Sequence, residues 1–305
     1  MIARRIIEHI KWIEGINVPL LAGFVYKLTT SLDNYLISRE KLPMQPLNTK
    51  PREKKITVSL TSFPARIEYV HIAIKSLMLQ THKPDRIILW LAETQFPDKS
   101  LPPQLKELQK FGLEIKWCED LYGHKRYVYC VKDQEPDEVI ITYDDDIIYS
   151  PLSIRRLMET HRRFPDCLVC ERAQALKYDV DGKLANPGRW DTISDVGIEQ
   201  PSFSLNPSPG GGLLIPYNAL SPDATDINKI KELAFKQDDL WTMFMAAEHG
   251  TRIIKTHKWH RIFSVVKDSQ TTSLASGNVI GGAYIGAVLR LAETYPSAYD
   301  RIINK

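Results

Sequence analysis

The chain has 305 residues, of which 43% are hydrophobic and 25% are charged, and its formal net charge is +3. These fractions are those of an ordinary globular protein and exclude the disordered and fibrous classes. A net charge this small argues against a dedicated nucleic-acid binder, which would carry a strongly basic domain or stripe. The length suits one large α/β domain with appendages.

The N-terminal residues are expected to form a separate unit, a helical arm and linker over residues 1–48. Apolar residues at helical spacing from Ile2 to Ile13 predict a first helix, and a second apolar segment runs from Leu20 to Ile37. The arm either packs on the body of the protein or on a second copy of the chain, or residues 1–40 lie along a membrane surface as an interfacial helix. Acidic residues dilute the basic face of the first segment, which favours the packed arm.

Targeting signals and cysteines point to the cytoplasm. No run of eighteen apolar residues occurs, so no transmembrane helix is predicted. Charged residues between Glu8 and Glu14 interrupt the apolar core that a cleavable signal needs. Cys167 and Cys170 form the one close cysteine pair, without a second pair at zinc-finger spacing. We expect buried free thiols in a reducing compartment.

After a charged, proline-rich linker, strand and helix patterns alternate from Ile56 to Thr142. This alternation predicts an α/β fold with a Rossmann-like, mostly parallel sheet and helices on both faces. Ligands bind beyond the carboxyl ends of such strands, so the polar residues after the first four strands are expected to line one crevice. The predicted strands are 56–60, 86–91, 113–117, 139–142, 167–170 and 251–255, with helices at 67–80, 101–111, 125–132, 152–164 and 240–249, an irregular stretch at 177–206 and a C-terminal helix ending at Glu293.

The strand at 139–142 leads directly into Tyr143 and the three consecutive carboxylates Asp144, Asp145 and Asp146. An isolated acidic triplet is more often a solvated turn. Here β-branched and aromatic residues flank the triplet on both sides, which predicts a partly buried strand end. Buried ionised carboxylates need a cation or a basic partner, and hard oxygen ligands suit Mg²⁺ or Mn²⁺ bound together with substrate phosphates.

Two further stretches carry candidate chemistry. Asp238 and Asp239 open the helix predicted at 240–249, where an aspartate is often only an N-cap. Gly210, Gly211 and Gly212 precede an apolar strand and allow close backbone approach to a ligand. The glycines match neither a P-loop nor a dinucleotide-binding GxGxxG pattern.

A strand that ends in Asp-x-Asp after three strand and helix units, followed about ninety residues later by an acidic pair at a helix start, resembles the GT-A glycosyltransferases. The resemblance extends from about Lys55 to His260, and within the family it suggests the bacterial enzymes that build capsule, lipopolysaccharide or similar surface glycans. It implies a metal-dependent inverting transferase that moves a sugar from a nucleotide-diphosphate donor, by default a UDP-sugar, to a glycan or lipid-linked glycan acceptor.

The resemblance also implies roles for individual residues. Asp144 and Asp146 would hold Mn²⁺ or Mg²⁺, although which two of the three aspartates bind metal stays open, and His260 is a candidate third ligand. Asp239 would be the catalytic base and Asp238 would orient the acceptor or the base. Contacts to the nucleotide and the donor sugar are implied for Thr61, Ser62, Arg66, Glu93, Lys125, Asp144, Asp145, Gly211 and Gly212.

In this interpretation residues 49–305 form one GT-A domain, with a nucleotide-binding half at 55–150 and an acceptor-binding half at 151–305. A sugar-nucleotide pyrophosphorylase is an alternative, but it usually carries a glycine- and lysine-rich loop after the first strand, and Thr61 to Arg66 contains no glycine. A non-catalytic glycan-binding subunit is a second alternative, although an idle fold has no reason to keep facing carboxylates. Formation of a homo-oligomer stays open.

Overall fold

The structure is a computed structural model that describes residues 19–192, 194–257, 263–269 and 283–304. The helix predicted between Ile2 and Ile13 lies outside the described residues, and so does His260. No helix within the described part of the chain is both long and apolar enough to cross a membrane. All four cysteines are free thiols, as predicted.

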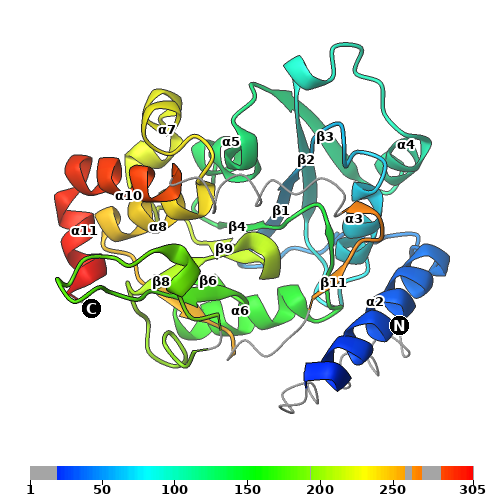
Figure 1. The fold of residues 1–305 in the computed structure, drawn as a ribbon. Helices are drawn as coiled ribbons and strands as arrows, with labels where there is room; N and C mark the ends of the chain where they lie inside the picture. Colours follow the sequence, from blue (N-terminus) through cyan, green and yellow to red (C-terminus); the bar gives the residue numbers. More distant parts are fainter. Residues whose placement is uncertain (1–18, 193, 258–262, 270–282, 305) are drawn as a thin grey trace.

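A seven-stranded sheet forms the centre of the molecule, in the order β10-β6-β9-β4-β1-β2-β3 (Figure 1). β9 is antiparallel to its neighbours β4 and β6, and the other neighbouring pairs are parallel. The mostly parallel sheet predicted from the sequence is therefore confirmed. The strands are β1 (Lys55–Thr61), β2 (Arg86–Ala92), β3 (Leu113–Cys118), β4 (Glu138–Thr142), β6 (Leu168–Cys170), β9 (Leu213–Ile215) and β10 (Ile253–Lys255).

Helices cover both faces of this sheet because its strands are apolar on both sides. In β2, Ile87, Leu89 and Leu91 belong to one buried cluster and Ile88 and Trp90 to another, as expected for side chains that alternate between faces. The first cluster includes side chains of α3 (Val70–Met78), α4 (Pro103–Gln109) and α6 (Ser153–Arg163). The second includes side chains of α5 (Lys125–Lys132), α7 (Ile227–Leu233), α8 (Asp238–His249), α10 (Ala283–Thr294) and α11 (Pro296–Ile303).

The strand directions decide which loops meet. The carboxyl ends of the parallel strands β1, β4, β6 and β10 lie at one edge of the sheet. Because β9 runs the opposite way, its first residue, Leu213, pairs with Thr142 at the end of β4. The glycine stretch before β9 therefore lies at the same edge as Asp144 to Asp146.

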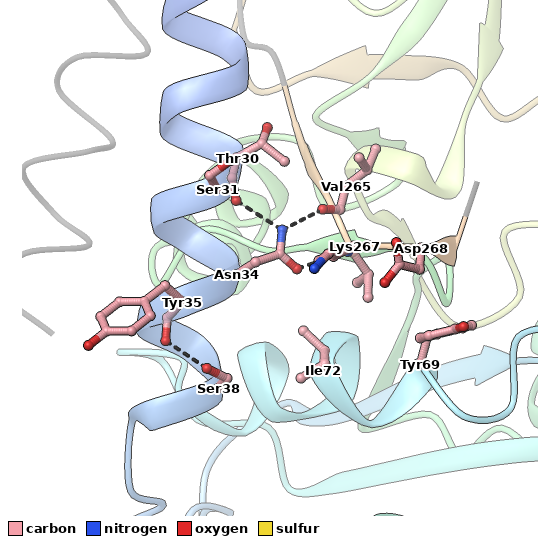
Figure 2. A pocket seen from close by; sticks show the side chains of 11 residues that line it. Thr30, Ser31, Asn34, Tyr35, Ser38, Tyr69, Ile72, Val265, Lys267 and Asp268 are labelled. Atoms are coloured by element: carbon pink, nitrogen blue, oxygen red, sulfur yellow. Dashed lines mark hydrogen bonds between the residues drawn. The ribbon is translucent and has the colours of Figure 1, made fainter. Parts of the chain in front are cut away.

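The helix α2 (Pro19–Arg39) packs on this body through α3 and the short strand β11 (Ser264–Val265), which pairs with β5 (Ile147–Ile148). Asp33 accepts a hydrogen bond from Ser264 at 2.6 Å, and both side chains are buried. Asn34 donates to the carbonyl of Val265 at 2.9 Å and accepts from the Lys267 backbone (Figure 2). A hollow of about 760 Å³ lies beside these bonds between α2, α3 and β11. The helix α2 is thus bound to the body within one chain.

Some predicted boundaries were wrong. The helix predicted from Ile67 begins at Val70, because Phe63 to Tyr69 form successive turns, with Arg66 donating to the Phe63 carbonyl and Tyr69 to the Arg66 carbonyl. The stretch predicted as irregular ends in β8 (Leu205–Pro207), which pairs with β7 (Ala173–Ala175). The helix α11 was not predicted. Pro296 is its first residue, and Tyr295 separates it from the end of α10.

Candidate active site

The three aspartates after β4 lie in a turn whose backbone is hydrogen-bonded to the side chain of Tyr149. The Tyr149 hydroxyl accepts a hydrogen bond from the Asp144 backbone N–H at 2.8 Å and donates to the Asp144 carbonyl at 3.1 Å. The Tyr149 side chain is fully buried. Directly after β11, the Val266 N–H donates to the Asp146 carbonyl at 2.7 Å. These bonds hold the backbone of the turn at Asp144 and at Asp146.

Asp145 points into the protein, toward the loop after β1. Its carboxylate accepts from the Ser62 hydroxyl at 2.6 Å and forms an ion pair with Arg66 at 2.8 Å. Arg66 also pairs with Asp146 at 2.9 Å. Burial raises the pKa of Asp145, although Arg66 and Ser62 act in the opposite direction. The structure therefore brings Ser62 and Arg66 to the acidic turn, and gives them Asp145 as their partner.

Asp144 and Asp146 remain the more open members of the triplet. Their side chains are 29% and 15% exposed, compared with 7% for Asp145. The second carboxylate oxygen of Asp144 faces Gly210, where an added Cβ would lie 3.1 Å from it. Asp144 and Asp146 are therefore partly exposed, whereas Asp145 between them is nearly buried.

Asp238 and Asp239 reach the same edge from the first turn of α8. The guanidinium of Arg126 on α5 lies between the two acidic segments, in close ion pairs with Asp144 and Asp238 and 3.3 Å from Asp239. Burial opposes the charge of Arg126, but the surrounding carboxylates outweigh it and raise its pKa. Arg126 therefore stays charged and joins two clusters that are far apart in the sequence.

The turn before α5 packs against Asp238 and is bonded to the end of α7. The 3₁₀ turn Tyr122–His124 precedes α5, and a Cβ added to Gly123 would lie 2.7 Å from the Asp238 carboxyl group. The fully buried His124 is 2.7 Å from the Tyr127 hydroxyl and 2.9 Å from the Ala234 carbonyl. Burial lowers the pKa of His124 to about 4. The neutral imidazole thus ties the start of α5 to the loop that leads into α8.

Asp239 is partly exposed, with 33% of its side chain accessible to solvent. Burial and then the charge of Asp238 raise its pKa well above the ordinary value, while Arg126 lowers it. Asp239 borders a pocket of about 370 Å³ whose polar lining includes Gln174, Asn186, Asn206, Ser208, Lys236 and Tyr284. A carboxyl group with a raised pKa beside a polar pocket is suited to accept a proton from a bound hydroxyl.

The glycine stretch packs against the acidic turn and the segment after β6. A Cβ on Gly210 would lie 3.0 Å from an Arg172 nitrogen, and one on Gly211 would lie 2.9 Å from the Arg172 backbone. Gly212 has φ of +94° and lies against the Tyr143 ring, where a Cβ would be 2.6 Å away. Close approach explains the glycines, and their contact with a ligand stays a prediction.

Other predicted site residues lie elsewhere or have other partners. Lys125 is buried in an ion pair with Asp120 at 2.6 Å, so its neighbour Arg126 is the α5 cation that contacts the aspartates. Thr61 donates to the Trp90 carbonyl at 2.8 Å. The remaining predicted contact, Glu93, is exposed and pairs with Lys99 at 3.0 Å.

Asp144 and Asp146 could supply only part of the ligands of a hard divalent cation. Within the described ranges, no three His, Cys, Asp or Glu side chains are grouped to hold a metal ion. Asp144 and Asp146 offer two partly open carboxylates, and Mg²⁺ and Mn²⁺ commonly take one or two protein carboxylates and complete their coordination with water and substrate phosphates. The residues present therefore fit a cation that binds together with a phosphorylated substrate.

No family model and no curated protein matches the chain. Among solved structures it is similar to 4-diphosphocytidyl-2C-methyl-D-erythritol synthase from Anaerococcus prevotii, with 15% identity over 72% of this chain and 96% of that chain and a TM-score of 0.45. It is also similar to glucosyl-3-phosphoglycerate synthase from Mycobacterium tuberculosis in complex with Mn²⁺, UDP and phosphoglyceric acid, with 11% identity over 82% and 87% of the chains and a TM-score of 0.41. At these low TM-scores neither similarity carries an argument about this chain.

Proposed function

We propose that the protein is a metal-dependent inverting glycosyltransferase that uses a nucleotide-diphosphate sugar as donor. The observation that carries the proposal is the convergence of two acidic segments at one edge of the sheet. Asp144 to Asp146 come from the end of β4 and Asp238 and Asp239 from the start of α8, with Arg126 between them. One segment suits a cation with a diphosphate and the other suits proton transfer, and the reaction requires both.

The donor end of the site is assigned to Asp144 and Asp146. When bound there, Mg²⁺ or Mn²⁺ would neutralise charge on the diphosphate leaving group. Asp145 would not hold the cation, because Ser62 and Arg66 already satisfy its buried carboxylate. The donor half of the protein would then be residues 55–150, with residues 151–305 supplying the base and the acceptor pocket.

Asp239 is assigned as the general base. It would take the proton from an acceptor hydroxyl, the oxygen would form a bond to the anomeric carbon, and the bond from that carbon to the diphosphate would break, with its electron pair leaving on the phosphate oxygen. Asp238 would hold Arg126 and so position the base. This assignment follows from the raised pKa of Asp239 and its place beside the pocket.

The pocket beside Asp239 is assigned to a carbohydrate acceptor. The amides of Gln174, Asn186 and Asn206 line it, and amide groups both donate to and accept from sugar hydroxyls. Lys236 and Arg172 add positive charge at its wall. These groups suit the glycan or lipid-linked glycan acceptors of surface polysaccharide synthesis, and the linkage formed would depend on which hydroxyl reaches Asp239.

A donor panel tests the proposal. The purified protein would be incubated with UDP-, GDP-, dTDP- and CMP-sugars in Mn²⁺ or in EDTA, with release of the nucleotide as the readout. We expect one donor class to be hydrolysed slowly in Mn²⁺ only, and a double variant with Asp144→Asn and Asp146→Asn to lose this activity. The absence of both turnover and Mn²⁺-dependent nucleotide binding across the panel would refute the proposal. Release of pyrophosphate from a nucleoside triphosphate and a sugar 1-phosphate would instead indicate a pyrophosphorylase.

A further inference from the structure

Arg126 has an unusual place in the site, because it is a buried cation in contact with the carboxylates of both acidic segments. One guanidinium nitrogen pairs with Asp144, and another pairs with Asp238 and lies 3.3 Å from Asp239. The Arg126 side chain is only 11% exposed. Three carboxylates in one partly buried place would repel one another strongly without this positive charge.

The contact with Asp144 raises a conflict for any cation that binds there. A guanidinium hydrogen bond uses a carboxylate oxygen that a divalent cation would also use, and two positive charges close to one carboxylate oppose each other. Asp144 has one oxygen in the Arg126 ion pair and the other toward Gly210. A cation at Asp144 therefore weakens the bond from Arg126, while the bonds from Arg126 to Asp238 and Asp239 lie on the other side of the guanidinium.

We propose that Arg126 is a positioning residue that competes with the divalent cation for Asp144 and holds Asp238 and Asp239 in place in both states. This inference rests on the proposed function only in assigning a cation to Asp144. Without metal, Arg126 keeps the two acidic segments together. With metal, its remaining bonds to Asp238 and Asp239 keep the base aligned with the donor end of the site.

The competition is tested by the affinity of the protein for Mn²⁺ alone, measured by calorimetry or by loss of the free-Mn²⁺ electron paramagnetic resonance signal. Arg126→Met removes the competing charge, so we expect Mn²⁺ to bind about tenfold more tightly than to the wild type. Lys125→Met is the matched control, since it removes one buried cation at the preceding position of α5, where the partner is Asp120. We expect its Mn²⁺ affinity to change less than twofold.

Arg126→Lys keeps the charge and guards against a folding failure of Arg126→Met. A lysine ammonium is a single point charge, and it cannot span Asp144 and Asp238 as the planar guanidinium does. We expect this variant to bind Mn²⁺ with an affinity between those of the wild type and Arg126→Met. We also expect Mn²⁺ to raise the melting temperature of Arg126→Met more than that of the wild type, because the metal then supplies positive charge that Arg126 no longer provides to these carboxylates.

The possible results separate this inference from the proposed function. Unchanged or weaker Mn²⁺ binding in both Arg126 variants would overturn the competition, even if the wild type transfers sugar. Tighter binding in both variants without transfer from any donor would support the competition and count against the transferase. An absence of Mn²⁺ binding in the wild type and in every variant would overturn the inference together with the metal site.

Discussion

The two acidic segments at the sheet edge are held in place by different means. Asp144 to Asp146 follow β4 after Tyr143. Their backbone is hydrogen-bonded by Tyr149 and Val266, in addition to the side-chain bonds from Ser62 and Arg66. Asp238 and Asp239 come from a helix start without a side-chain cap, and their placement depends on long-range contacts with α5 and the turn before it. The segment assigned to the cation is thus bonded through its backbone and its side chains, whereas the segment assigned to the base is positioned by α5 and the turn before it. Each prediction below tests one part of this comparison.

The largest effect is expected at Asp239. Asp239→Asn keeps the shape of the side chain but removes the group that accepts the proton, so turnover should fall by about 10²–10⁴-fold. Binding of the nucleotide in Mn²⁺ should stay within about twofold of the wild type, as measured by calorimetry, because the donor end is intact. Loss of nucleotide binding would indicate that Asp239 is a ligand of the metal, which would contradict the division of tasks between the two segments.

Asp145 tests whether the middle aspartate is structural. Asp145→Asn removes one of the two carboxylates in ion pairs with the buried Arg66. Breaking buried ion pairs is costly, so the free energy of unfolding in urea should fall by about 2–3 kcal/mol. Mn²⁺ affinity should change little. Asp137→Asn is the control, since Asp137 pairs with Lys55 at the surface at 2.9 Å, and ion pairs exposed to solvent contribute little to stability. Equal losses in the two variants would contradict a buried role for Asp145.

The pH dependence of stability tests the role of His124, which links the start of α5 to the loop before Asp238 and Asp239. Its pKa is about 4 in the folded protein and 6.5 in the unfolded chain, so the unfolded state takes up a proton first as the pH falls. His124 therefore contributes stability above pH 6.5 that is lost between about pH 6.5 and 4, by up to about 3 kcal/mol. His124→Gln can still donate to the Ala234 carbonyl, and the stability difference between wild type and variant should change over that range. A difference that is constant with pH would show that His124 does not titrate as described.

A smaller effect is expected at Gly123. Gly123→Ala would place a Cβ 2.7 Å from the Asp238 carboxyl group, so Asp238 and the base beside it must shift. Small displacements of catalytic groups are costly, and turnover should fall about tenfold with little change in Mn²⁺ affinity. Gly286→Ala is the control, because its nearest neighbour would be 3.4 Å away in α10. An unchanged rate in Gly123→Ala would mean that the second segment adapts freely.

Much of the fold follows from local pattern, because buried strands and amphipathic helices repeat with different periods. The antiparallel direction of β9 could not be predicted from local pattern, because it depends on the path of the chain between β6 and Leu213. The aspartates stood out because charge interrupts an apolar strand. Arg126 was missed in favour of Lys125, since consecutive residues at a helix start point about 100° apart and only the packing of α5 decides which one meets the site. Nothing in the local sequence marks the contact between Gly123 and Asp238.

The bonds that tie α2 to the body have a practical consequence for shortened forms of the protein. Asn34 holds β11, β11 pairs with β5, and Val266 bonds to the backbone of Asp146. A protein cut to begin at residue 49 would leave Ser264 without its buried partner Asp33 and would remove the support behind the acidic turn. Such truncation should therefore weaken cation binding, although the described part of the deleted segment, residues 19–48, lies outside the sheet and includes none of the five aspartates.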